Sequence, residues 1–244
     1  YIRLCLITGN DTFSCTGDFD EMHTDTNNLS EVVHREMPVM FAKAQAASAL
    51  NRSFYQTVQN LGDDLYAQYF ALTSPSFATD RYVLTPDWQR RFWTVVYVET
   101  APQLKAILDN AEPNSGEQAL ANILWVYAFH RLTDHFGPIP YFDAAEAKEV
   151  IPYDPMDKIY DDFFKRLDTA VKDLKNLPEG TSVFKGYELM YDGDIHNWIR
   201  FANTLRLRLA LRISKVDPAR AKTEAEAAVV SGVLTDNAPN AFLL

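Results

Sequence analysis

The segment from residue 115 to residue 136 constrains the fold more than any other part of the chain. Ser115 and Gln118 have the spacing of a helix capping box, and Gly137-Pro138 ends the helical pattern abruptly. Between them almost no polar face remains, since the apolar residues are Leu120, Ile123, Leu124, Trp125, Val126, Tyr127, Phe129 and Leu132. A helix that is apolar on every side has to be covered on every side. The chain must therefore build several layers around it.

Further helices are predicted from periodicity and from helix-start signals, at residues 36–60, 86–110, 155–176, 194–215 and 218–231. Thr85 and Asp154 each precede a proline and are expected to cap the helices that follow them. Pro102 allows a bend within the second of these helices. Because no long alternating run is present, the only β-structure we expect is a small hairpin near residues 181–191. The sequence therefore predicts an all-α fold built as a stack of helix pairs.

The helix at 194–215 is predicted to be buried on two opposite faces. Leu205 and Leu209 share one apolar stripe, while Leu207 and Leu211 lie on the other side at about 100° per residue. Arg212 falls inside the apolar stripe, so we expect it to be buried and paired with a carboxylate. The aromatic residues of the predicted helices are expected in the core, namely Trp93, Tyr97, Trp125 and Trp198.

The charge balance excludes several classes of partner. The 244 residues contain 33 Asp and Glu against 23 Lys and Arg, for a formal net charge of −10. An acidic chain is a poor partner for nucleic acid or for an anionic membrane surface, which both attract clustered basic residues. With 9 glycines in the chain, a glycine-rich phosphate loop is also disfavoured. Binding of a ligand, with no cofactor, is the expectation that remains.

The first fifteen residues have the features of a leader. Leu4-Cys5-Leu6-Ile7 is short for the apolar part of a signal peptide, so residues 1–15 are interpreted as its remnant or as a disordered leader. Cys15 follows a small residue and precedes a polar stretch, as at a bacterial lipoprotein processing site, although Thr12 stands where an aliphatic residue is usual. The alternatives are an inert thiol and a Cys5–Cys15 disulfide. Residues 16–244 form the predicted helical domain and contain no cysteine for a zinc site or nucleophile.

Three stretches together resemble the SusD/RagB family of outer-membrane lipoproteins. The first runs from Ser14 to Asp20 and is followed by Asp25-Thr26-Asn27. The second is the helix end His135-Phe136-Gly137-Pro138-Ile139-Pro140-Tyr141. The third is Tyr191-Asp192-Gly193-Asp194, which leads into the segment from Trp198 to Ala210. The resemblance extends over essentially the whole chain, and because members of the family are usually longer, the domain would be incomplete at its C-terminus.

The resemblance implies a tetratricopeptide-like helical scaffold without catalytic activity. Members of the family sit on the cell surface, anchored in the outer membrane through a lipid alone, and hold an oligosaccharide or sometimes a peptide. They work beside a SusC-like TonB-dependent transporter that imports this ligand. The alternatives from other classes are a helical-repeat adaptor that binds peptides or proteins and, less favoured, a glycan hydrolase.

The irregular segment 61–88 is the predicted ligand surface, since a glycan needs aromatic faces for its C–H groups and planar polar groups for its hydroxyls. Its members of these types are Asp63, Asp64, Tyr66, Tyr69, Phe77, Asp80, Arg81, Tyr82 and Trp88. The family's use of the loop after the first helix implies ligand contacts for Asp64, Arg81, Tyr82 and Trp88. The alternative is that these aromatic rings only pack the loop onto the scaffold.

Catalytic and metal sites are not expected. His130 and His135 are five residues apart on a helix, unlike the four-residue spacing of a zinc-binding helix. The paired acids Asp63-Asp64, Asp161-Asp162 and Asp192/Asp194 are close in sequence, whereas a glycosidase needs two carboxyls facing each other across a cleft. Asp194 is interpreted as a helix cap instead.

Overall fold

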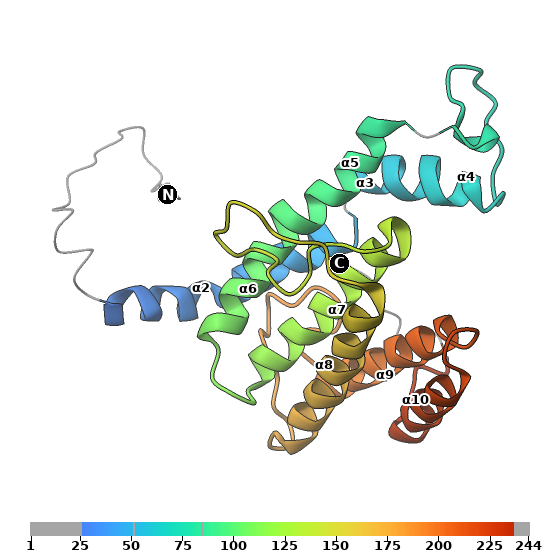
Figure 1. Ribbon diagram of the computed structural model, residues 1–244. Helices are drawn as coiled ribbons and strands as arrows, with labels where there is room; N and C mark the ends of the chain where they lie inside the picture. The colour runs from blue at the N-terminus through green and yellow to red at the C-terminus, as the bar shows by residue number, and fades with distance from the viewer. Residues whose placement is uncertain (1–25, 51, 84, 237–244) are drawn as a thin grey trace, which may run out of the picture.

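The computed structural model describes residues 26–50, 52–83 and 85–236 and is helical throughout (Figure 1). In chain order the elements are α2 (Thr26–Ser48), α3 (Arg52–Tyr55), the π-helix η1 (Gln56–Asp63), α4 (Asp64–Tyr66), the 3-10 helix η2 (Thr79–Arg81), α5 (Pro86–Thr94), the π-helix η3 (Val95–Thr100), α6 (Ala101–Asn110), α7 (Gly116–Phe136), α8 (Met156–Asn176), α9 (Ile195–Arg212) and α10 (Pro218–Ser231). The predicted all-α stack of helix pairs is confirmed. None of the helices in the described ranges is long and apolar enough to cross a membrane.

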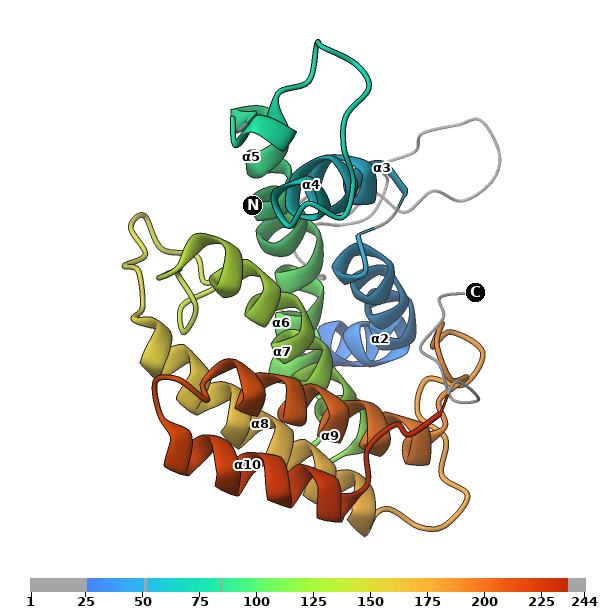
Figure 2. The ribbon, with the colours of Figure 1, turned by 90° about the vertical axis from the view of Figure 1, so that its right-hand side faces the viewer.

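Helix α7 lies at the centre of the packing, as its sequence predicts. It packs along α8 and also contacts α6, α2 and α9, while α10 pairs with α9 on the outside (Figures 1 and 2). Its residues Leu120, Ile123, Val126, Phe129 and Leu132 are all fully buried. Ser115 accepts a hydrogen bond from the backbone N–H of Gln118, which confirms the N-terminal cap.

The first helix differs from the prediction at both ends. Helix α2 begins at Thr26 and ends at Ser48, and the chain turns at Leu50, whose φ is 59°. Pro38 stands inside α2 and removes one backbone donor, which costs on the order of 3 kcal/mol in a free helix. The helix continues because Met37, Phe41 and Ala44 are buried in the core, and most helical stability in proteins comes from such packing.

The expected bend at Pro102 is absorbed by the π-helix η3. The backbone N–H of Ala101 bonds to the carbonyl of Val96, five residues back, so the turn before the proline is wider than an α-turn. The hydroxyl of Thr100 donates to the carbonyl of Val95 at 2.9 Å. The helix from Pro86 to Asn110 therefore passes the proline as α5, η3 and α6 without a break.

Asp154 does not cap α8, which corrects the sequence prediction. The N-cap residue is Pro155, and the Asp154 carboxylate instead accepts the backbone N–H groups of Tyr141 and Phe142 at 2.8 and 3.0 Å. Its own backbone N–H donates to Ile139, so the residue fastens the chain after Pro138 to the start of α8. Thr85 also makes no side-chain cap bond.

Helix α9 is buried on one face only, contrary to the prediction. Trp198, Leu205 and Leu209 are buried against the neighbouring helices, but Leu211 is 63% exposed. Arg212 is exposed as well and pairs with Asp134 across the surface, at 3.5 Å. The buried stripe of α9 ends before its last residues, where Leu211 and Arg212 are exposed.

The core positions predicted for the four helical aromatic residues are confirmed for two of them. Trp125 and Trp198 are buried, at 3% and 0% exposure. Trp93 and Tyr97 are partly buried and pack on the rim of the core, where the Tyr97 hydroxyl donates to the carbonyl of Pro140. Burial raises the pKa of the Tyr97 hydroxyl far above its ordinary value.

The predicted hairpin near residues 181–191 is absent from the described structure, where an isolated bridge between Ser182 and Asp194 closes a loop instead. Gly193 has φ +79°, and a Cβ built there would lie 2.3 Å from the Val183 carbonyl oxygen. The glycine of the Tyr191–Asp194 stretch is thus required by its backbone. Asp194 caps α9 by accepting the N–H groups of His196 and Asn197, as predicted.

Glu188 holds this loop to α2 from inside the protein. Its carboxylate is 4% exposed and accepts the backbone N–H groups of Met190, Tyr191 and Gly193 at 2.7 to 3.0 Å. The amide of Gln45 on α2 donates to the same carboxylate, while its oxygen accepts the backbone N–H of Leu189. A buried carboxylate is tolerated here because the Gln45 amide and the backbone N–H groups satisfy its oxygens with hydrogen bonds.

We therefore expect Glu188→Gln to lower the free energy of unfolding by about 2–4 kcal/mol. The NH₂ group of the new amide would face backbone N–H groups, and these would lose their hydrogen-bond acceptor. Urea unfolding followed by circular dichroism measures this. The matched control is Glu226→Gln, whose side chain is 66% exposed and pairs weakly with Lys222, with an expected change within about 0.5 kcal/mol. Equal midpoints for both variants would contradict the assignment.

Asp173 on α8 is also a buried carboxylate, but unlike Glu188 it weakens folding when it is charged. It is 7% exposed, and burial raises the pKa of its carboxyl above the ordinary value, with Lys172 opposing the shift. Because the folded state favours the protonated acid, the charged carboxylate weakens folding at neutral pH. We expect Asp173→Asn to raise the melting temperature by about 1–3 °C at pH 7. The gain should shrink as the pH falls into the carboxyl range, and a gain that is independent of pH would contradict this cause.

Candidate ligand-binding lobe

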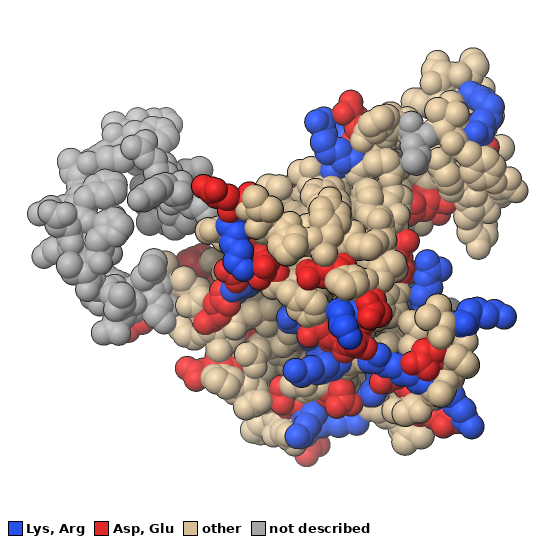
Figure 3. Space-filling view, viewed as in Figure 1, with Lys and Arg blue, Asp and Glu red and all other residues tan. Residues whose placement is uncertain are grey.

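The aromatic lobe, defined here as the described residues from 64 to 83 and from 85 to 88, projects from the helical body. It contains α4, the loop that leads through η2, and the first residues of α5, at the upper right of Figure 1. In the same view the lobe presents a mostly uncharged surface, whereas acidic and basic side chains are interspersed over the lower part of the molecule (Figure 3).

Aromatic side chains are exposed on this lobe to an unusual degree. Of the eight exposed Tyr and Phe residues in the described ranges, four lie in it, namely Tyr69, Phe70, Phe77 and Tyr82. Tyr69 is 79% exposed and Tyr82 is 57% exposed, so most of each ring faces solvent. Exposed large apolar groups that cluster are typical of binding surfaces.

Two residues of the lobe have strained backbones and hold each other. Gln68 and Tyr82 have φ values of 61° and 60°, in the left-handed region that side chains other than those of Gly, Asn and Asp rarely enter. The amide of Gln68 donates to the Tyr82 hydroxyl at 2.8 Å, and the Tyr66 ring meets the Tyr82 ring edge-on at a centroid distance of 5.3 Å. The Tyr82 side chain is therefore fixed from two sides while its other face is open.

The remaining predicted site residues make other contacts. Trp88 on α5 packs against Phe77, with ring centroids 5.5 Å apart. Arg81 donates to the carbonyl of Phe77 at 3.0 Å and is exposed. Asp64 accepts the side-chain amide of Gln59 at 2.8 Å.

The structure thus places Asp64, Arg81, Tyr82 and Trp88 in one lobe but joins none of them to another by a hydrogen bond or ion pair in its described part. The ring contact of Trp88 runs through Phe77. Sequence reasoning missed Phe70 and Gln68. The pair Tyr69-Phe70, which is apolar and follows directly after the end of α4, was the available signal for the first; nothing local indicated the second.

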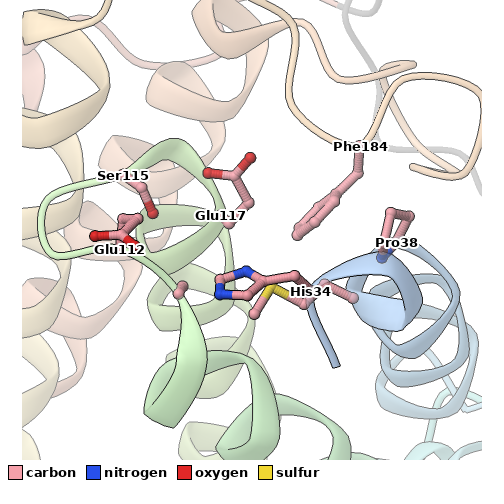
Figure 4. A pocket seen from close by; sticks show the side chains of 8 residues that line it. His34, Pro38, Glu112, Ser115, Glu117 and Phe184 are labelled. Atoms are coloured by element: carbon pink, nitrogen blue, oxygen red, sulfur yellow. The ribbon is translucent and has the colours of Figure 1, made fainter. Parts of the chain in front are cut away.

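Apart from the aromatic lobe, the surface has a hollow between α2, the turn from α6 to α7, and the loop before α9 (Figure 4). Its volume is about 340 Å³. Figure 4 shows His34 in the middle, with Glu112, Ser115 and Glu117 on one side and Phe184 on the other. The residues that the structure describes include no group of three His, Cys, Asp or Glu side chains arranged to hold a metal ion.

The histidines and acid pairs singled out in the sequence occupy structural positions. His130 is 2% exposed, and burial together with Arg208 and Arg131 lowers its pKa to about 3, so it is neutral at physiological pH. His135 lies 3.2 Å from Asp63 and bonds to Gln89.

The other paired acids bind within the scaffold. Asp162 accepts from Arg166 and from the Tyr141 hydroxyl, and Asp161 pairs with Arg220. Asp192 accepts the backbone N–H of Gly186, and Asp194 caps α9. These carboxylates are committed to the scaffold rather than directed at a common cleft.

Paired helices that carry an exposed aromatic lobe define a ligand-binding scaffold, and comparison with known families names it. The family model described as "SusD-like: Susd and RagB outer membrane lipoprotein" matches residues 16–244. The chain belongs to this SusD-like family of outer-membrane lipoproteins, and the resemblance noted in the sequence is confirmed. Proteins of this family are binding proteins. A comparison with curated proteins gave no match.

Solved structures show the same fold. A chitin-binding SusD homologue from Flavobacterium johnsoniae is 34% identical, with a TM-score of 0.77 over 84% of this chain and 45% of that one. A SusD homologue from Bacteroides vulgatus is 29% identical, with a TM-score of 0.78 over 87% and 46%. A third, from Bacteroides uniformis, is 31% identical, with a TM-score of 0.75 over 84% of this chain and 44% of that one. The chain spans less than half the length of these relatives.

If the exposed rings of the lobe serve binding, their removal should leave stability nearly unchanged. We expect Tyr69→Ser to change the free energy of unfolding by less than about 0.5 kcal/mol, because the ring is mostly in water already. Phe129→Ala, at a fully buried position of α7, should cost about 3–5 kcal/mol in the same urea titration. A large loss in Tyr69→Ser would favour the alternative that these aromatic rings pack the loop onto the scaffold.

Proposed function

We propose that this chain captures oligosaccharides at the cell surface through the aromatic lobe and does so without catalysis. The observation that carries the proposal is the set of exposed rings in the lobe together with the fixed side chain of Tyr82. A sugar ring presents an apolar C–H face that stacks on such rings, and this contact is worth most where water is excluded. No bond needs to be made or broken for this role.

The polar groups of the lobe suit the edges of a sugar. Arg81 is exposed and donates one bond to a backbone carbonyl, so further N–H groups of its guanidinium can reach hydroxyl oxygens. Asp64 and Gln68 add an acceptor and an amide at the base of the lobe. We assign ligand contacts to Asp64, Arg81, Tyr82 and Trp88, with Tyr69 and Phe70 as additional stacking surfaces.

Chitin oligosaccharides are the first ligands to test. Two of the solved relatives are described as chitin-binding proteins, at 31% and 34% identity over 84% of this chain. The acetamido groups of chitin offer both an apolar methyl group and amide hydrogen-bonding atoms, which match a surface of aromatic rings and planar polar side chains.

In the full assembly we propose that residues 16–244 form the helical domain behind a leader at 1–15. Cys15, which lies outside the described residues, would carry the lipid anchor. The partner proposed for import is a SusC-like TonB-dependent transporter. Support for these assignments comes from the family description, which is that of an outer-membrane lipoprotein.

A peptide- or protein-binding adaptor is the second candidate. The observation that favours it is the presence of exposed valines at the two ends of α10, where Val216 before the helix is 87% exposed and Val230 in its last turn is 88% exposed. A protein partner that covers these valines would not involve the aromatic lobe. Binding that is lost in Val230→Asp and kept in Tyr82→Ala would support this candidate.

The glycan proposal predicts that Tyr82→Ala weakens binding of a chitin hexasaccharide by about 10-fold, because one stacking platform is lost. Isothermal titration calorimetry measures the affinity, and chromatography of the recovered sugar checks that the ligand is not consumed. Tyr153→Ala is the matched control, since that tyrosine is similarly exposed, at 63%, and lies outside the lobe.

Two results would contradict the proposal. One is equal affinity of the Tyr82 and Tyr153 variants for every glycan bound by the unmodified chain. The other is release of shortened sugars in proportion to added protein, which would place the chain among the hydrolases.

A further inference from the structure

A separate groove opens where the π-helix η1 meets α7 and α9. Its volume is about 700 Å³, within the usual range for a small-ligand site. Tyr127 and Arg131 of α7 form one wall, and Phe201 and Arg208 of α9 form the other. None of the residues of the aromatic lobe lines this groove.

Arg131 is held in place without a carboxylate. Its guanidinium lies 5.7 Å from the ring centre of Phe92 and 6.0 Å from that of Tyr127. Two of its N–H groups donate to neutral oxygens, the Ser48 carbonyl and the Gln59 amide, each at 3.2 Å. A guanidinium has five N–H groups, so donors remain for a planar anion.

Arg208 supplies a second unneutralised charge on the facing helix. It makes no ion pair with any carboxylate in the described part of the chain, although most of the other arginines there do. Asp134 lines a smaller adjoining hollow together with Arg208. That carboxylate is already engaged by the Tyr160 hydroxyl and by Arg212.

The third basic group of the groove adds no charge. His130 lies on α7, and its burial together with the charges of Arg208 and Arg131 keeps it neutral. Two arginines that face one groove in a chain of net charge −10 leave a local positive potential. Such a potential attracts anions, and more strongly where the site is partly shielded from water.

We propose that this groove binds a ligand that bears a carboxylate on a ring, such as an acidic sugar. The carboxylate would lie between Arg131 and Arg208, and the ring would lie against Tyr127 and Phe201, whose own rings are 5.7 Å apart. The fork geometry of a guanidinium matches the two oxygens of a carboxylate, which favours this anion over a point charge. The lining of this site includes none of the lobe's residues, although Gln59 in its wall bonds both to Arg131 and to Asp64 of the lobe.

The test compares D-glucuronate with D-glucose by calorimetry on the 244-residue chain. The two sugars differ at the carboxylate, so glucuronate should bind at least about 10-fold more tightly, as expected for charge-assisted hydrogen bonds. Arg208→Gln should remove this preference, and because Arg208 is exposed the variant is expected to fold. Higher salt should weaken the binding of glucuronate and leave that of glucose unchanged.

Arg90→Gln is the control, since Arg90 is also exposed but lies on α5 beside Asp87. Trp88→Ala should also leave glucuronate binding intact, which separates this site from the aromatic lobe. The proposal is overturned if glucuronate and glucose bind alike, if neither binds at millimolar concentration, or if Arg208→Gln changes nothing. An acidic peptide that binds through Arg208 in place of glucuronate would overturn it in favour of a polypeptide occupant.

Discussion

The burial of most of α7 is the constraint on which the rest of the structure depends. A helix with apolar side chains on all sides is stable only inside a shell of other helices, and α2, α6, α8 and α9 provide that shell. The polar groups that this packing buries form hydrogen bonds with neighbouring groups. Asp162 joins Arg166 to the Tyr141 hydroxyl, and Glu188 collects three backbone donors beside α2. Each carboxylate fastens a loop to a helix, so the loops become part of the core.

The helices could be predicted because their signals are local. The predicted limits of α7 and α10 were correct, since the capping residues and glycines that end these helices lie at the helix ends in the sequence itself. The errors at Asp154 and Arg212 have a different origin. The Asp154 carboxylate could accept hydrogen bonds from the first N–H groups of α8 or from the loop at Tyr141, and it bonds to the loop. Arg212 lies on an apolar stripe that is longer than the surface that covers it. Tertiary contacts decide both, and periodicity does not contain them.

The candidate site could be predicted only as a segment. An aromatic-rich stretch without helical period pointed to the lobe, and the exposure of Tyr69 and Tyr82 agrees with that interpretation. The link between Gln68 and Tyr82, fourteen residues apart, could not be predicted because it depends on two left-handed backbone positions. The groove with Arg131 and Arg208 was invisible for a similar reason. Nothing in the sequence says which arginines lack an acidic neighbour in three dimensions.

The left-handed conformations of Gln68 and Tyr82 have a consequence for how fast and how tightly a ligand can be captured. A residue that must enter a rare backbone state on binding would subtract that conformational cost from the affinity. Here the cost is met during folding, because the hydrogen bond between the two residues and the edge of the Tyr66 ring hold the platform in the free protein. Under the proposed function, a sugar that reaches the lobe would meet a surface whose backbone is already in place, and the encounter would need no slow rearrangement.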